Sequence, residues 1–221
     1  SDVCSSDLNT MFPMQRNEIS VDNTTLLSTF IYKIANERLF SREEYRVPTK
    51  IDPYYLSDDH AIKLGEHLKH PFILKRIVGQ SGMSYGALGK NAITALSKGL
   101  AKAGTWMNTG EGGLSEYHLK GNGDIIFQIG PGLFGVRDKE GNFSEGLFKE
   151  VAQLSNVRAF ELKLAQGAKT RGGHMEAEKV NEEIAKIRNV EPYKTINSPN
   201  RYEFIHNAED LIRFVDQLQQ L

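Results

Sequence analysis

Short apolar runs alternate with helix-like stretches through the middle of the chain. Apolar runs bounded by turns are typical of buried strands, and apolar residues three and four positions apart are typical of amphipathic helices. The sequence therefore predicts four strands, each followed by a glycine-rich turn. The predicted strands lie within residues 72–80, 105–113, 124–132 and 159–167, and the helices between them within residues 87–103, 115–120 and 145–155, the last with Ser144 as its N-cap.

The segments on either side predict helices and long connections. The long connection after the fourth strand is expected to act as a lid, because unstructured connections of that length are usually functional. In order, we expect a helix over Thr24–Phe40, an extended arm over residues 41–55, a short helix over Asp58–Lys69, the lid over residues 167–206 with a helix at 177–188, and a last helix that begins at Ala208 with Asn207 as its N-cap.

This alternation predicts an α/β fold with a parallel sheet and crossover helices, either doubly wound or a (β/α)₈ barrel. A complete barrel takes about 250 residues. In the barrel interpretation, residues 71–221 are therefore the first four βα units of a barrel that is truncated at its C-terminus. Residues 9–70 would form a helical and extended N-terminal segment, and the unpatterned residues 1–8 a non-native or disordered tail.

Composition excludes several classes of partner. The 221 residues carry a formal net charge of −1 with interspersed signs, so neither a nucleic acid nor a membrane surface is an expected partner. The single cysteine, Cys4, excludes a disulfide framework and a zinc or iron–sulfur site within this chain. No run approaches the roughly 18 apolar residues of a membrane span, and no signal peptide is evident, so we expect a cytoplasmic protein.

Nineteen of the 20 glycines lie between Gly79 and Gly173, which predicts turns that approach a cofactor or phosphate closely. The run Gly130–Gly135 matches GxGxxG, but a charged turn follows it where a Rossmann motif needs a helix. Residues 84–91 lack the first glycine and the final Ser/Thr of a P-loop. His60, His67 and His70 have helical spacing without a completing cluster, so no metal site is expected.

Polar side chains at the predicted strand ends are the candidates for ligand binding. Asn108, Thr109 and Glu111 follow the second strand, and a polar ligand would satisfy their hydrogen-bonding groups. Gln128 lies near the end of the third strand, where it is either a satisfied core residue or a ligand contact. Lys163 lies among apolar residues of the fourth strand, and burying its ammonium group without an anion is costly.

The segment after Lys163 is rich in hydrogen-bonding and cationic side chains. Gln166, Lys169 and Arg171 follow within eight residues, which favours a dicarboxylate or phosphate ligand unless the loop is simply solvated. His174 lies nearby and is either an acid or base or an incidental loop residue.

Four runs in this order, SGMSYGALG, MNTGEGG, FQIGPGLFGV and ELKLAQGAKTRGGH, resemble the FMN-binding synthase domain of glutamate synthase over about residues 45–221. The KTRGGH and SPNR runs are more similar to the stand-alone FMN-binding glutamate synthase family. The resemblance implies a (β/α)₈ barrel with FMN above the strand ends. It also implies reductive amination of 2-oxoglutarate, with hydride passing from reduced FMN to 2-iminoglutarate, to give L-glutamate.

The resemblance assigns a role to each candidate. Gly82, Met83, Ser84, Asn108 and Thr109 would line the flavin, Gln128 would bond its pyrimidine edge, and Lys163 would lie beside N1 and O2 and stabilise the reduced ring. Glu111, Gln166, Lys169 and Arg171 would surround the substrate, with Lys163 and Glu111 as the catalytic pair. The chain departs from the family pattern at Gly89, where serine is usual, and at TRGG, which replaces PGEGG.

The same resemblance implies partners outside this chain. Ammonia would come from solution or from glutamine, and electrons from ferredoxin or an NAD(P)H system. An iron–sulfur cluster would belong to a C-terminal part after residue 221, and strands seven and eight would hold the FMN phosphate, so this chain alone is expected to be inactive. Two alternatives stay open: FMN-dependent oxidation of a 2-hydroxy acid or amine with His174 as the base, and a non-catalytic subunit.

Overall fold

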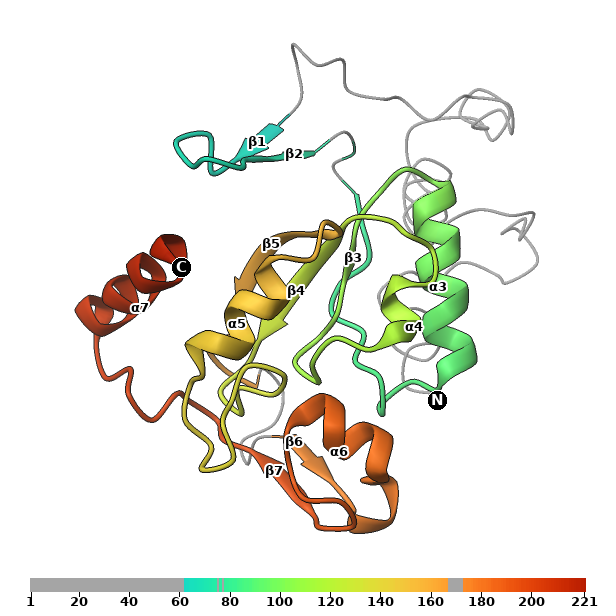
Figure 1. The fold of residues 1–221 in the computed structure, drawn as a ribbon, viewed down its shortest axis with the longest axis vertical. Coiled ribbons are helices and arrows are strands. Elements are labelled where there is room, and N and C mark those ends of the chain that lie inside the picture. The colour runs from blue at the N-terminus through green and yellow to red at the C-terminus, as the bar shows by residue number, and fades with distance from the viewer. Residues whose placement is uncertain (1–61, 75, 77, 167–172) are drawn as a thin grey trace, which may run out of the picture. The chain divides into compact units, whose positions relative to one another are not determined.

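The computed structural model describes residues 62–74, 76, 78–166 and 173–221 (Figure 1). All of them belong to one of the two compact units of the chain, Tyr55–Leu221. The tail over residues 1–8, the helix over Thr24–Phe40 and the arm over residues 41–55 lie outside the described residues.

A parallel sheet forms the centre of this unit, in the strand order β3-β4-β5. Its strands are β3 (Met107–Asn108), β4 (Ile125–Ile129) and β5 (Val157–Leu162). The connections contain α4 (Glu116–Leu119) and α5 (Glu145–Ala152), and α3 (Lys90–Lys102) precedes β3. The parallel sheet with crossover helices is therefore confirmed (Figure 1).

The first βα unit differs from the prediction. β1 (Ile62–Leu64) and β2 (Phe72–Leu74) pair with each other as an antiparallel hairpin, so the helix predicted over Asp58–Lys69 is wrong for its described residues. Gly65 has φ +67 and its carbonyl accepts the Leu68 N–H at 2.8 Å, which closes a turn where a helix was expected. Among the described residues of the predicted first strand, only Gln80 reaches the central sheet, through a parallel bridge to Met107.

The helix ends agree with their capping residues. The Ser144 side chain accepts the Leu147 N–H at the start of α5, and that of Asn207 accepts the Asp210 N–H at the start of α7 (Ala208–Gln220). α3 begins three residues later than predicted, after the N-cap Gly89.

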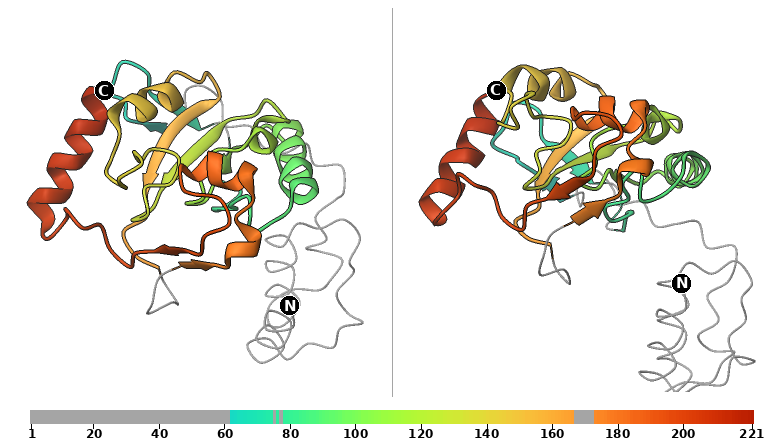
Figure 2. Two further views of the ribbon diagram at one scale, coloured as in Figure 1. Left: turned by 60° about the horizontal axis from the view of Figure 1, so that its bottom comes forward. Right: turned by 90° about the horizontal axis from the view of Figure 1, so that it is seen from below.

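The predicted lid contains more structure than the sequence indicated. β6 (Gly173–Met175) and β7 (Ile196–Ser198) form an antiparallel hairpin, and between them lie the 3₁₀ turn η2 (Ala177–Lys179) and α6 (Glu182–Arg188). Three-residue strands are too short to show a period of two, so no sequence pattern indicated the hairpin. The predicted helix over residues 177–188 is shorter because the Asn181 side chain caps a new start by accepting the Ile184 N–H at 2.9 Å. Figure 2 shows α6 together with the hairpin.

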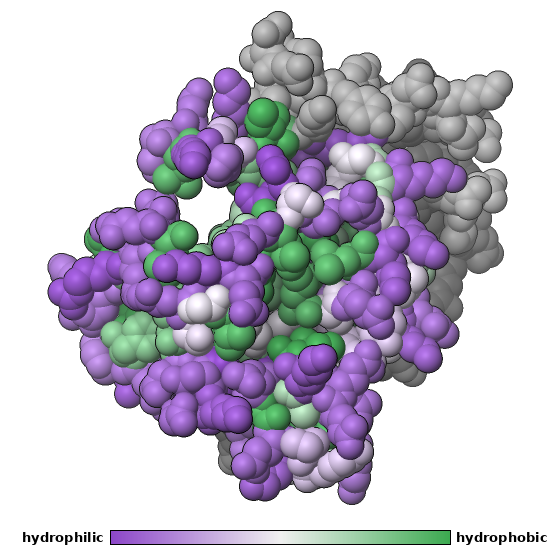
Figure 3. Space-filling view, in the orientation of Figure 1, coloured by the Kyte–Doolittle hydropathy of each residue, from purple (hydrophilic) through white to green (hydrophobic). Residues whose placement is uncertain are grey.

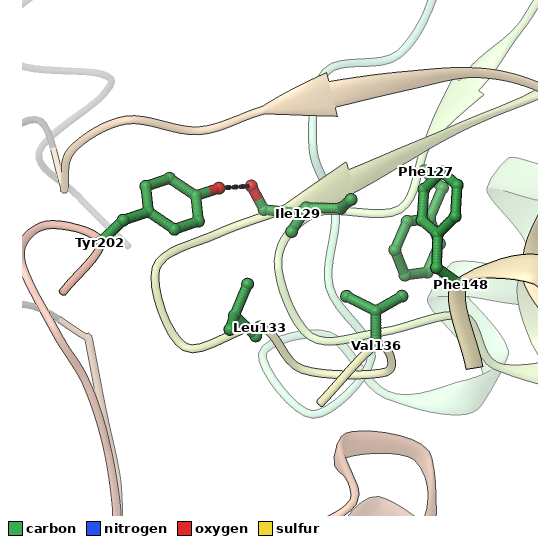
Figure 4. Close-up of a cluster of buried hydrophobic side chains, with 6 residues drawn as sticks. All are labelled: Phe127, Ile129, Leu133, Val136, Phe148 and Tyr202. Carbon is green, nitrogen blue, oxygen red and sulfur yellow. Dashed lines mark hydrogen bonds between the residues drawn. The ribbon is translucent and has the colours of Figure 1, made fainter. Parts of the chain in front are cut away.

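The hydrophobic core lies between the sheet and its helices. Alternate residues of β4 are buried, as a half-buried strand requires, while Gln128 points to the opposite face. Figure 4 shows the largest cluster, in which Tyr202 donates its hydroxyl hydrogen bond to the Ile129 carbonyl. On the face seen in Figure 3, hydrophobic residues are exposed over the central sheet between α3 and α5. The cluster consists of Phe127, Ile129, Leu133, Val136, Phe148 and Tyr202.

Candidate functional site

The carboxyl ends of β3, β4 and β5 meet at one edge of the sheet, which is where open α/β sheets carry their ligands. Main-chain hydrogen bonds continue the ladder past the strand ends. The Thr109 N–H donates to the Ile126 carbonyl at 3.0 Å, and the Lys163 N–H donates to the Ile129 carbonyl at 2.9 Å. The side chains that follow each strand are therefore held next to one another.

Lys163, Glu111 and Gln166 form a closed hydrogen-bonded network at this edge. The Lys163 Nζ lies 2.9 Å from Glu111 Oε1 and donates to Gln166 Oε1 at 3.0 Å, and Gln166 Nε2 donates to Glu111 Oε2 at 2.7 Å. The Lys163 side chain is 32% exposed and that of Glu111 16% exposed. Glu111 thus provides the anion that the sequence required for Lys163, and within the described residues two of the three ammonium hydrogens have partners, which leaves one for a ligand.

A second group of polar side chains lies on the same sheet face. Asn108 Nδ2 donates to Glu161 Oε1 at 2.9 Å, Gln128 Nε2 donates to the same oxygen, and the Gly110 N–H donates to Asn108 Oδ1 at 2.9 Å. A Cβ atom on Gly82 would lie 3.2 Å from the Gln128 amide. The structure therefore brings the candidates from three turns together. Sequence reasoning missed Glu161, although it lies two residues before Lys163 and hence on the same strand face.

A cavity of about 120 Å³ lies next to the Lys163 network, lined among others by Ser84, Glu111, His174, Arg188 and Ser198. Arg188, at the end of α6, is 6% exposed. Its Nη2 donates to the Tyr85 carbonyl at 3.3 Å, and the guanidinium carbon lies 5.1 Å from the centre of the Phe134 ring. Its buried Nε has no hydrogen-bond partner in the part of the chain that the structure describes.

Arg188 is a second functional candidate that the sequence did not reveal. Burial lowers the pKa of its guanidinium, and the negative charge of Glu111 opposes that effect. A buried cation beside a polar cavity favours an anionic ligand, because an anion compensates the desolvation of the charge. The only sequence signal was an arginine at the end of a predicted amphipathic helix, which normally marks a solvated position.

His174 is placed at the rim of the cavity with both ring nitrogens in contact with side-chain oxygens. Nδ1 lies 2.7 Å from Asn197 Oδ1 and Nε2 lies 2.9 Å from Glu176 Oε1. A base that takes a proton from a substrate needs a nitrogen within reach of that proton. His174 would have to break one of these contacts to act as that base.

The remaining candidates are placed as follows. Lys169 and Arg171 lie outside the described residues. Residues 130–135 form a turn in which Leu133 has φ +52, so the GxGxxG run does not open a helix. Among the described residues no cluster of three His, Cys, Asp or Glu side chains could hold a metal ion. In the same residues no helix is long and apolar enough to cross a membrane.

Comparison with known proteins agrees with the motifs at these strand ends. The family model described as "Conserved region in glutamate synthase" matches residues 15–221. The glutamate synthase large subunit-like protein YerD of Bacillus subtilis is 56% identical over 215 residues, which cover 96% of this chain and 41% of YerD. The archaeal glutamate synthase [NADPH] of Methanocaldococcus jannaschii is 36% identical over 62% of this chain and 25% of its own length.

A third relative is the ferredoxin-dependent glutamate synthase 2 of Synechocystis, which is 31% identical over 75% of this chain and 11% of its own length. The chain thus spans less than half the length of the curated relatives that it matches. The resemblance carried by the four glycine-containing runs is confirmed. The chain belongs to the glutamate synthase family.

Proposed function

We propose that this chain is part of an FMN-dependent oxidoreductase that reduces 2-iminoglutarate, formed from 2-oxoglutarate and ammonia, to L-glutamate. The observation that carries the proposal is the network of Lys163, Glu111 and Gln166 at the strand ends, beside a cavity that contains the buried Arg188. The names of its relatives support the reaction class.

The residues at the strand ends fit the ring system of FMN, which supplies hydride when it is bound and reduced. Gly82 is packed closely against Gly110 and Gln128: a Cβ atom would lie 3.1 Å from the Gly110 Cα and 3.2 Å from the amide. A larger residue at this position would push the turn away from Gln128, so glycine keeps the two close together. Gln128 offers both a donor and an acceptor to the pyrimidine edge, and the remaining Lys163 hydrogen can bond an electron-rich ring atom.

The cavity fits the substrate because 2-oxoglutarate carries two carboxylates. Arg188 presents a cation there whose Nε is unpaired in the described part of the chain, and a guanidinium binds carboxylates well. Glu111 accepts hydrogen bonds from both Lys163 and Gln166, so it fixes the positions of these two side chains beside the cavity. Lys169 and Arg171 are proposed as further substrate contacts, as the family resemblance implies.

We propose further that residues 71–221 belong to a (β/α)₈ barrel, with residues 9–70 as a segment before it. In the described residues the strand order ends at β5, which would pair with the next strand of a barrel. Ferredoxin or an NAD(P)H system would supply the electrons. An iron–sulfur cluster would belong to the part of a longer protein that follows residue 221, where the FMN phosphate would also be held.

The alternative oxidation of a 2-hydroxy acid or amine requires a free base. His174 is a poor candidate for that base, because both of its ring nitrogens contact acceptor side chains. Reduction of a protonated imine adds only hydride to its carbon and needs no base, which favours the glutamate synthase reaction over the oxidase.

The proposal is tested with protein made from the longest natural reading frame that contains this chain. After anaerobic reduction of its flavin, 2-oxoglutarate with ammonium should reoxidise the flavin and form glutamate. Lys163→Met should slow reoxidation by at least about tenfold, as loss of a charged hydrogen-bonding group predicts. Lys149→Met, on the exposed face of α5, should have no effect. Bleaching of oxidised flavin by a 2-hydroxy acid, without reoxidation by 2-oxoglutarate, would support the oxidase instead.

A further inference from the structure

The turn Gly82–Ser84 contacts His118, a fully buried residue of α4. His118 Nε2 lies 2.9 Å from the Met83 carbonyl oxygen. On the other side of the same residue, the Met83 N–H donates to the Asn108 carbonyl at 3.2 Å. Both main-chain polar groups of Met83 are therefore held by the protein.

The partners of the ring fix the position of its proton. The Ser115 N–H donates to His118 Nδ1 at 3.2 Å, and Ser115 Oγ lies 2.8 Å from the same nitrogen. A main-chain N–H is only a donor, so Nδ1 must be the acceptor and the single proton resides on Nε2. His118 is thus neutral and donates to Met83, and its burial, which lowers the pKa of the imidazole, favours the same form.

His118 is itself held rigidly. It occupies the third position of α4 in a capping box with Ser115, where glutamate or glutamine is usual. Its own carbonyl accepts from the Ser97 hydroxyl of α3 at 2.6 Å, and the same hydroxyl accepts the Gly121 N–H at 2.8 Å. Ser97 and Ser115 are both buried. The imidazole therefore links Met83 to α3 and α4 and fixes its position relative to these two helices.

The turn above has little room to move. A Cβ atom on Gly110 would lie 2.8 Å from the Ser84 nitrogen, and one on Gly112 would lie 2.9 Å from the Ser84 Cβ. These contacts show that two turns of the site pack backbone against backbone, so a small displacement of Met83 would disturb both.

We propose that His118 is a positioning residue whose Nε2–H holds the Met83 carbonyl and so fixes the turn Gly82–Ser84 beneath the flavin. The identity of the ligand as FMN rests on the proposed function. The geometry of the turn does not, because the hydrogen bond between His118 and Met83 lies within the protein itself.

Two variants of the longest natural reading frame separate positioning from folding. In His118→Gln the side-chain amide nitrogen can take the place of Nε2 and donate to Met83. In His118→Asn the amide reaches only the place of Nδ1, next to Ser115, and leaves the Met83 carbonyl unpaired. Both variants lose the imidazole, so both should lower the melting temperature of the flavin-free protein by similar amounts.

The dissociation constant of FMN should rise by about tenfold more in His118→Asn than in His118→Gln, which is the effect of roughly one hydrogen bond. Hydrogen exchange of the segment around Met83 in flavin-free protein should be faster in His118→Asn. Equal FMN affinities and equal exchange in the two variants would overturn the inference and leave His118 a residue of the core.

The wild type provides a test that does not depend on the variants folding. Long-range ¹H–¹⁵N correlation of the His118 ring should show a neutral imidazole protonated at Nε2. A ring protonated at Nδ1 would overturn the inference. Wild-type protein that refuses FMN while showing the expected tautomer and protection at Met83 would contradict the proposed function and leave the positioning of the turn intact.

Discussion

Replacing Gly130 with alanine should disrupt the Lys163 network directly. A Cβ atom at this position would lie 2.3 Å from Glu111 Oε2 and 2.8 Å from Glu111 Cβ, so the carboxylate must move. Movement breaks the contacts of Glu111 with Lys163 at 2.9 Å and with Gln166 at 2.7 Å. Overpacking costs about 1–3 kcal/mol, and a partly exposed ion pair adds at most about 1 kcal/mol.

We therefore expect Gly130→Ala to lower the free energy of unfolding by about 2 kcal/mol, or the melting temperature by roughly 4–8 °C. Urea unfolding followed by the fluorescence of Trp106, the single tryptophan, measures the first quantity. In the longer protein, the dissociation constant of 2-oxoglutarate measures the effect on the site.

Gly99→Ala is the matched control for this substitution. Gly99 lies inside α3 and a Cβ atom there would meet nothing within 4 Å, so alanine should stabilise the helix by about 0.5–1 kcal/mol. A Gly130→Ala protein with wild-type stability and wild-type affinity for 2-oxoglutarate would refute the reasoning, because Glu111 could then relax without loss.

Three further predictions concern stability. Because the pKa of His118 is lowered in the folded protein, the unfolded chain binds a proton at this residue more readily. The free energy of unfolding, measured with urea, should therefore fall as the pH drops below about 6.5, by up to 1.4 kcal/mol per pH unit. His118→Gln should remove this part of the pH dependence. Tyr202→Phe loses the buried hydrogen bond to Ile129 and should cost about 1 kcal/mol in the same assay, whereas Tyr193→Phe, at a position 62% exposed, should cost nothing measurable. Gly89→Ser adds a capping side chain to α3 at a position where a Cβ atom would meet nothing within 4 Å. It should raise the free energy of unfolding by about 0.5 kcal/mol and so raise the melting temperature slightly. A lower melting temperature would contradict the capping argument.

The sequence predicted the elements whose signals are local. The apolar run of β4, the caps at Ser144 and Asn207, and the helical spacing of α3 each involve residues a few positions apart, and each prediction is confirmed apart from small shifts at the ends. The hairpins β1–β2 and β6–β7 were missed, because strands of three residues carry almost no period.

The candidate site was predictable to the extent that its residues follow strands directly. Lys163 and Glu111 stood out because a lysine in an apolar strand requires an anion, and parallel strand ends meet at one edge. Arg188 and His118 were not predictable in this way, since their roles depend on contacts with Tyr85 and Met83, which are 103 and 35 residues away along the chain. Glu161 is the intermediate case. Its position two residues before Lys163 places it on the same face of the strand, but does not indicate that Asn108 and Gln128 are its hydrogen-bond partners.

The central claim is that this chain forms part of an FMN site. It is tested most directly by the visible absorbance spectrum of the protein from the longest natural reading frame containing the chain, followed by identification of the flavin that it releases on denaturation. The account predicts the two bands of an oxidised flavin and FMN as the released species. Folded, colourless protein that also refuses added FMN would contradict it.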